Sequence, residues 1–131
     1  VNDGTKTPKT GLGSIGDIHF VLKQEKVNDD LLVVGGDNLF DFNIEEYIRF
    51  AQAKNGCVSL GLYDIKNLSE AKLFGVVALD ESHKVISFEE KPETPKSTLI
   101  AMCFYYLPKI WLPNAAKSRR AGVPMVCQPV P

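Results

Sequence analysis

The fold of this chain is constrained most by the run LLVVGGDN at residues 31–38. Four consecutive apolar residues are typical of a buried strand. The two glycines allow a close approach to the backbone, and Asp37 follows at the carboxyl end of the strand. Ligands of open α/β sheets bind outside the carboxyl ends of strands, and an aspartate there can hold a hard divalent cation that accompanies phosphates. The alternative interpretation is a strand followed by an ordinary Asp/Asn turn.

Helical and strand-like patterns alternate along the chain. Apolar residues recur at helical spacing from Ser14 to about Lys26, and again after Asn43, which is placed to cap the second helix. A strand-like run at 57–63 follows, so residues 31–63 predict a βαβ unit whose two strands are parallel. Later strand-like runs lie at 76–79, 84–88 and 99–107, and the polar turn 80–83 joins the first two as a hairpin.

Length and composition favour a single globular domain. The chain has 131 residues, a net charge of −1 and no basic block, so its charge gives no support to nucleic-acid binding. No apolar run approaches the roughly 18 residues of a membrane span, and no signal-peptide pattern is present. The cysteines at 57, 103 and 127 lack CxxC pairs and nearby histidines. This pattern argues against structural zinc and suits free thiols in a reducing cytoplasm.

Two glycine positions could bring a ligand close to the backbone. The glycine-rich turn at 11–16 opens the first helix, and its exposed N–H groups could bind a phosphate or the edge of a base. The alternative for this turn is an ordinary helix entry. Gly75 stands where a strand begins, and it either admits a ligand or only permits a turn.

The segment FEEKP at 88–92 brings two carboxylates and a lysine to a strand end. One glutamate could accept hydrogen bonds from hydroxyl groups, and Lys91 could neutralise a phosphate as a point charge. The alternative is a solvated charged loop. No Ser/His/Asp or Cys/His arrangement has a spacing that supports nucleophilic catalysis by a side chain.

The order of these motifs resembles that of the sugar-phosphate nucleotidyltransferase family. The segments that carry the resemblance are LGSIGD, LLVVGGDNLF, LFGVV, FEEKP and PKSTLI, and it covers residues 1–108. It implies a Rossmann-like three-layer α/β/α domain with a mixed sheet, present in part over residues 1–110 and followed by an irregular tail at 111–131. It also implies a cytoplasmic enzyme that joins a sugar 1-phosphate to a nucleotide from a nucleoside triphosphate and releases pyrophosphate.

The resemblance further implies roles for six residues. Gly13 and Gly16 line the nucleotide base, Asp37 binds Mg²⁺, Gly75 contacts the sugar, Glu90 binds its hydroxyls and Lys91 binds its phosphate. Of these, Asp37 and Lys91 are the expected catalytic residues. Phosphoryl chemistry of this type proceeds without a covalent enzyme intermediate and depends on positioning and charge neutralisation.

The chain also departs from the family pattern. The GGxGTRLxPxT loop that grips the triphosphate and a second metal-binding aspartate have no counterpart, and Cys103 stands near a position where glycine is usual. We therefore expect an N-terminally truncated domain that is inactive alone. Loss of a neighbouring strand would expose the edge of the strand at 31–35, which a homo-oligomer would cover.

Two other functions remain open from the sequence. One is a non-catalytic binding or oligomerisation module derived from the same fold. The other is a glycosyltransferase of similar fold, which is the weaker hypothesis. Its usual metal signature is Asp-x-Asp, and the segment 36–38 supplies one aspartate only.

Overall fold

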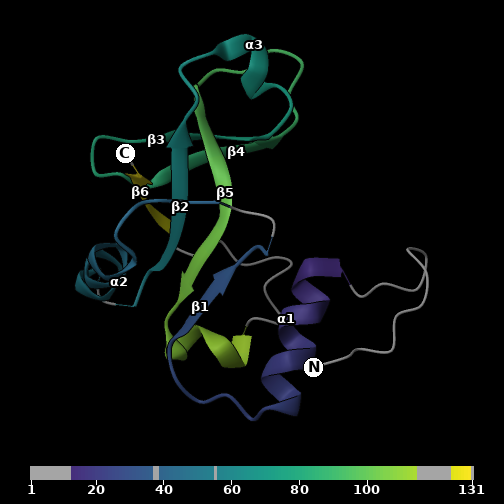
Figure 1. The fold of residues 1–131 in the computed structure, drawn as a ribbon, viewed down its shortest axis with the longest axis vertical. Helices are drawn as coiled ribbons and strands as arrows, with labels where there is room; N and C mark the ends of the chain where they lie inside the picture. Colours follow the sequence, from purple (N-terminus) through teal and green to yellow (C-terminus); the bar gives the residue numbers. More distant parts are fainter. Residues whose placement is uncertain (1–12, 37–38, 55, 115–124, 131) are drawn as a thin grey trace.

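The computed structural model of the chain describes residues 13–36, 39–54, 56–114 and 125–130 (Figure 1). Within these residues, six strands form one mixed sheet, and helices flank it. The elements in chain order are α1 (Gly13–Gln24), β1 (Leu31–Val34), α2 (Ile44–Ala53), β2 (Val58–Asp64), α3 (Leu68–Ala71), β3 (Gly75–Leu79), β4 (Val85–Glu90), β5 (Leu99–Leu107), η2 (Lys109–Asn114) and β6 (Met125–Val130).

Strand β5 is the centre of the sheet. The strand order is β4-β3-β5-β2-β6, and β1 also pairs with β5. Because β2 occupies one edge of β5, β1 and β3 share the other edge, at residues 104–107 and at Ile100 respectively. Both β1 and β2 run antiparallel to β5. The predicted parallel direction of these two strands is therefore confirmed, although β5 lies between them.

Local predictions for the second helix and the hairpin are confirmed. The side chain of Asn43 caps α2, accepting hydrogen bonds from the N–H groups of Glu45 (2.9 Å) and Glu46 (3.4 Å). Strands β3 and β4 pair antiparallel across the turn at 80–83, with a bulge in the ladder next to Leu79. In that turn His83 adopts a φ of 60°, and its N–H donates to the carbonyl of Asp80 at 3.0 Å.

The segment at 111–131 is not irregular throughout. Residues 125–130 form β6, which pairs parallel with β2 from Val58↔Met125 to Tyr63↔Val130. The prediction of an irregular tail is wrong for these six residues because the free edge of β2 offers a row of backbone partners. Pro129 within β6 is compatible with an edge strand, where a missing N–H costs no ladder bond.

Each face of the sheet carries its own core. On one face, Tyr47 and Ala51 of α2 pack on Phe104 and Tyr106 of β5. The opposite face buries Leu60, Leu62 and Val77.

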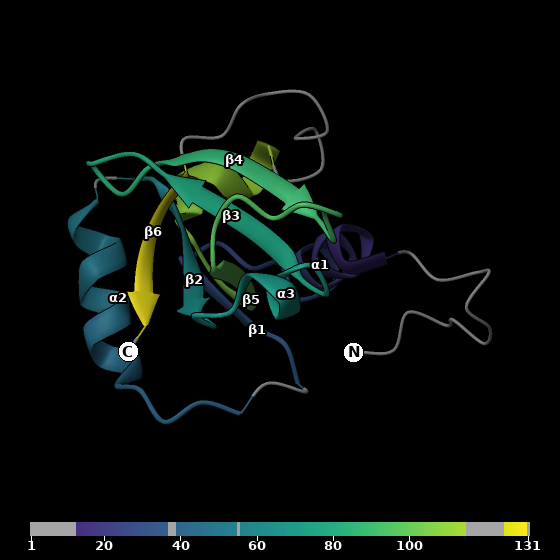
Figure 2. The same cartoon turned by 90° about the horizontal axis from the view of Figure 1, so that it is seen from above.

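Strands β4 and β6, at the two ends of the strand order, are in contact, so the sheet is strongly curled (Figure 2). The predicted partial α/β domain with a mixed sheet is confirmed. No helix within the described ranges has the length and apolarity that a membrane span requires.

Candidate functional site

Three of the predicted site residues gather near a split along one edge of β5. The N–H of Gly35 donates to the carbonyl of Cys103 at 2.7 Å, so the carboxyl end of β1 reaches the middle of β5. On the same edge, Val76 pairs with Ile100, which places the start of β3 just beyond that point. The end of β1 and the beginning of β3 therefore meet along a few residues of β5. We call Gly75, Glu90, Lys91 and Cys103 the split-edge site.

At Gly75 two side chains of β4 converge. Gly75 pairs with Glu90 across the β3–β4 ladder, so both residues lie on the same face of the sheet. A Cβ atom at position 75 would lie 2.8 Å from Phe88 Cζ and 3.2 Å from Glu90 Oε2. The glycine thus lets the Phe88 ring and the Glu90 carboxylate pack directly on the backbone of β3. The groups that approach this glycine belong to the same chain, and contact between Gly75 and a ligand stays a prediction.

Lys91 has a left-handed backbone conformation directly before a proline. Its φ is 47°, and such a conformation costs an L-residue about 1–2 kcal/mol. Its N–H donates to the carbonyl of Phe74 at 3.0 Å, which ties the end of β4 to the residue before β3. The ammonium lies 4.0 Å from Glu90 Oε1, and the two side chains are 67% and 66% exposed. Lys26, Lys66 and His83 share this left-handed conformation, so it does not by itself mark a functional residue.

Tyr105 lies on the same face of β5 as Cys103 and is the residue that the sequence analysis missed. Burial raises the pKa of the Tyr105 phenol, and the neighbouring Cys103 and Glu90 raise it further. Residues at i and i+2 of a strand share a face, so the spacing from Cys103 was the signal that could have identified it. The Cys103 side chain is exposed, which leaves a thiol where the resemblance expects a glycine.

The other predicted site residues lie on a different element or outside the described residues. Gly13 begins α1 and Gly16 lies in its first turn, as the glycine-rich helix opening predicted. The three atoms nearest to a Cβ at Gly75 belong to Phe88 and Glu90 of β4. Asp37 lies outside the described residues. Within the described ranges, no group of three His, Cys, Asp or Glu side chains is arranged to hold a metal ion.

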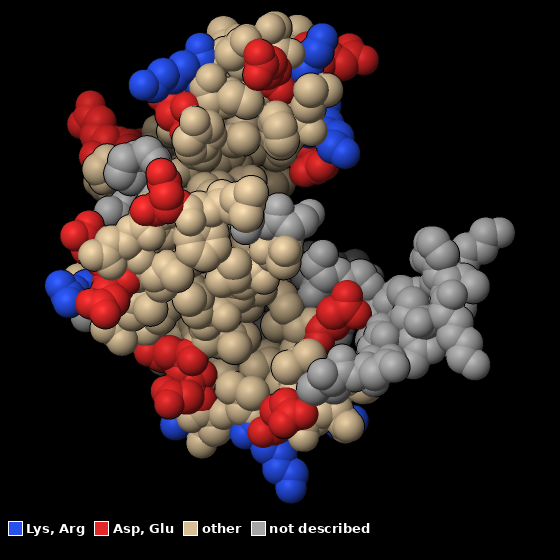
Figure 3. All heavy atoms as spheres, in the orientation of Figure 1, with Lys and Arg blue, Asp and Glu red and all other residues tan. Residues whose placement is uncertain are grey.

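Charge is distributed locally rather than as a broad field. On the face shown in Figure 3, acidic and basic side chains alternate around the periphery, and the centre is uncharged. A large field of one sign steers charged ligands over a distance, whereas a mixed surface does not.

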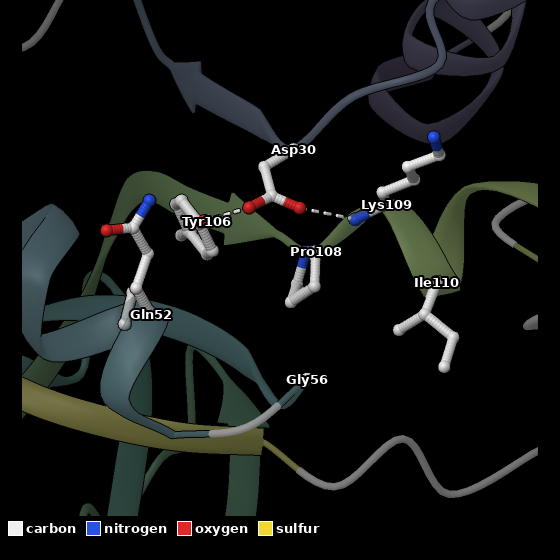
Figure 4. Close-up of a pocket in the computed structure, with 8 residues that line it drawn as sticks. Asp30, Gln52, Gly56, Tyr106, Pro108, Lys109 and Ile110 are labelled. Atoms are coloured by element: carbon white, nitrogen blue, oxygen red, sulfur yellow. Dashed lines mark hydrogen bonds between the residues drawn. The ribbon is translucent and has the colours of Figure 1, made fainter.

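A solvent-open hollow of about 520 Å³ lies at the other end of β5 (Figure 4). One of the polar residues that line it is Asp30, which accepts hydrogen bonds from the hydroxyl of Tyr106 and from the N–H of Lys109 (2.8 Å). The hydrogen bond from Tyr106 lowers the pKa of the Asp30 carboxyl most, and the hydrogen bond from the Lys109 N–H lowers it further. The carboxylate joins the start of β1 to the end of β5, which is a structural role and leaves the split-edge site as the candidate for chemistry.

Comparison with known proteins identifies relatives of this chain. A family model described as "Nucleotidyl transferase" matches residues 6–123. The bifunctional protein GlmU of Methanocaldococcus jannaschii is 34% identical over 86 residues, which cover 66% of this chain and 19% of that protein. Glucose-1-phosphate adenylyltransferase of Thermosipho africanus is 29% identical over 104 residues, covering 76% of this chain and 25% of that protein.

The fold is also found among solved structures. A putative glucose-1-phosphate thymidylyltransferase from Bacillus anthracis, in complex with a sucrose, superposes with a TM-score of 0.72 at 20% identity. The match covers 89% of this chain and 52% of that one. The chain thus spans about half the length of this structure, and a quarter or less of the two curated relatives above.

Proposed function

Because the chain belongs to the sugar-phosphate nucleotidyltransferases of the nucleotidyl transferase family, we propose that the split-edge site binds the sugar phosphate of that reaction. The observation that carries the proposal is the position of Lys91 beside Glu90 at the end of β4, where its ammonium lies 4.0 Å from Glu90 Oε1. The N–H of Lys91 donates to the carbonyl of Phe74, which holds this backbone next to the start of β3. The likeness to a solved structure supports the fold alone, so the ligand is inferred from the residues of the site.

The chemistry of the site suits a phosphorylated pyranose. Glu90 offers carboxylate oxygens that accept hydrogen bonds from vicinal hydroxyls, and Lys91 offers an ammonium to the phosphate. Their separation of 4.0 Å places the acceptor and the cation within the span of one sugar phosphate. Both side chains face solvent, so we expect weak binding, because charged contacts in water contribute little.

Mg²⁺ and the nucleoside triphosphate belong to the same proposal. Asp37 would hold the cation, since Mg²⁺ commonly takes one or two carboxylates and completes its shell with phosphates and water. Gly13 and Gly16 would contact the nucleotide base.

The 131 residues contain no GGxGTRL loop for the triphosphate. We therefore expect sugar phosphate binding without turnover, measured as no pyrophosphate release from mixed nucleoside triphosphates and glucose 1-phosphate.

Replacing Lys91 by glycine should weaken ligand binding while preserving the fold. Glycine relieves the left-handed backbone at no steric cost, so the unliganded variant should be at least as stable as the wild type. Loss of the ammonium should weaken glucose 1-phosphate binding about twofold to fivefold, as expected for a charged contact exposed to water. The measurement is the thermal shift caused by glucose 1-phosphate with Mg²⁺.

Lys96→Ala is the matched control for that experiment. Lys96 is an exposed lysine five residues along the same loop, 3.8 Å from Glu89. Its removal should leave the thermal shift unchanged, whereas Asp37→Ala should remove the part of the shift that depends on Mg²⁺. A wild-type protein that shows no shift at all would favour the non-catalytic module instead.

We also propose that β1 mediates homodimerisation. Within the described residues β1 pairs with β5 alone, and its sequence LLVV has none of the charges, prolines or bulges that protect edge strands. The N–H of Gly35 points to β5, so by alternation the N–H groups of Leu32 and Val34 point away from it. Two copies could pair these groups antiparallel in a two-fold symmetric dimer.

Val34→Pro should convert such a dimer to a monomer. Proline removes one outward N–H and leaves the ladder with β5 intact, because edge strands tolerate it. Val34→Ala keeps the N–H and should remain dimeric. Sedimentation equilibrium gives the molar mass of each protein, and a monomeric wild type at high concentration would refute the dimer.

A further inference from the structure

We propose that the ring of Phe88 is a sugar-binding surface of the split-edge site and determines its preference for a pyranose over a bare phosphate. This inference rests on the proposed function, since it names a further contact for the same ligand. Phe88 was part of the FEEKP motif, but no role followed for it from the sequence. Its place in the structure suggests one.

The first observation is where the ring lies. Phe88 pairs with Val77, two positions along the ladder from the pair of Gly75 and Glu90, so all four residues share one face of the β3–β4 hairpin. The ring leans diagonally onto Gly75, since its Cζ and Cε2 atoms would lie 2.8 and 3.4 Å from a Cβ at that position. Glu90 Oε2 reaches the same point at 3.2 Å. An aromatic ring and a carboxylate therefore converge on one backbone position.

The second observation is that the ring stays accessible. Phe88 is 50% exposed, although Val77 opposite it is fully buried. Support from Gly75 holds one part of the ring against the backbone and leaves another part facing solvent. An aromatic side chain held in this way, beside an acceptor and an ammonium, matches the usual composition of small-molecule sites, which combine apolar surface with a few polar groups.

Elementary chemistry indicates the ligand. An aromatic face carries a partial negative charge and attracts partially positive C–H groups. A pyranose offers a face of C–H bonds together with equatorial hydroxyls, so one ring could rest on Phe88 while its hydroxyls reach Glu90. Inorganic phosphate offers no such face, and it would use Lys91 alone.

The test compares glucose 1-phosphate with inorganic phosphate by NMR of the phenylalanine rings. The Phe88 signal is assigned by its loss in Phe88→Leu. Glucose 1-phosphate should shift this signal, and inorganic phosphate should not. Phe88→Leu should weaken glucose 1-phosphate binding about fivefold to tenfold and leave inorganic phosphate binding unchanged. Ile86→Leu is the control, because Ile86 is a 65% exposed residue of the same strand that lies next to the bulge.

The outcomes separate the two proposals. If glucose 1-phosphate perturbs the backbone signals of Glu90 and Lys91 but not the Phe88 ring, the inference is overturned and the proposed function stands. The inference is also overturned if Phe88→Leu weakens both ligands equally, because that would indicate a general structural effect. If no sugar phosphate perturbs any of the three residues, the proposed function fails, and the role of Phe88 fails with it.

Discussion

Phe104→Ala is expected to destabilise the fold by about 3–5 kcal/mol, which is much of the stability of a domain this size. The Phe104 side chain is 0% exposed and makes edge-to-face contacts with Tyr47, Phe40 and Phe42, at centroid distances of 4.8, 5.4 and 5.1 Å. Its removal would leave a cavity between α2 and β5 and would detach the loop that follows the β1 carboxyl end. Chemical denaturation followed by circular dichroism measures the loss.

The control for this change is Ile86→Ala. Ile86 is equally apolar but 65% exposed, so its truncation should change the free energy of unfolding by less than about 0.5 kcal/mol. If Phe104→Ala costs less than about 1 kcal/mol, the aromatic cluster does not hold the helix to the sheet as described.

Gly61→Ala is expected to cost about 1–3 kcal/mol through overpacking. A Cβ at position 61 would lie 3.1 Å from Phe104 Cβ and 3.4 Å from the Phe104 carbonyl oxygen. Neither atom is the end of a flexible side chain, so the neighbouring strand would have to shift. Gly61 also lies where the β2–β5 register shifts, between Leu60 and Leu62. The measurement is the denaturation midpoint at constant m-value.

Gly36→Ala provides the matched comparison for Gly61. A Cβ at position 36 would have no atom within 4 Å, so this variant should unfold at nearly the wild-type midpoint. Equal losses at both positions would contradict the overpacking explanation, because alanine without a steric contact lowers the entropy of the unfolded chain and should not destabilise the fold. A loss confined to position 61 would confirm the tight packing between β2 and β5.

Much of the local structure could be predicted from the sequence, because its signals are local. The cap at Asn43 and the hairpin around 80–83 depend on residues a few positions apart, and both are present. The placement of β5 between β1 and β2 could not be predicted in this way. It depends on pairs of residues that lie from 35 (Asp64↔Leu99) to 76 (Leu31↔Leu107) positions apart in the sequence. Periodicity carries no information about which strand a free edge will accept. The strand at 125–130 was missed for the same reason.

The candidate site shows the same division. The sequence alone determined which residue types could bind a sugar phosphate, since FEEKP supplies acceptors and a cation wherever it lies, and the motif order pointed to the family. Only the tertiary structure decided that Glu90 and Phe88 converge on Gly75, and that Lys91 is held in a left-handed conformation. The physical reason is that the chemical groups of FEEKP are fixed by the sequence itself. Which of these groups meet at Gly75 is fixed by the β3–β4 register, because the register sets the face and the partner of each side chain in this hairpin.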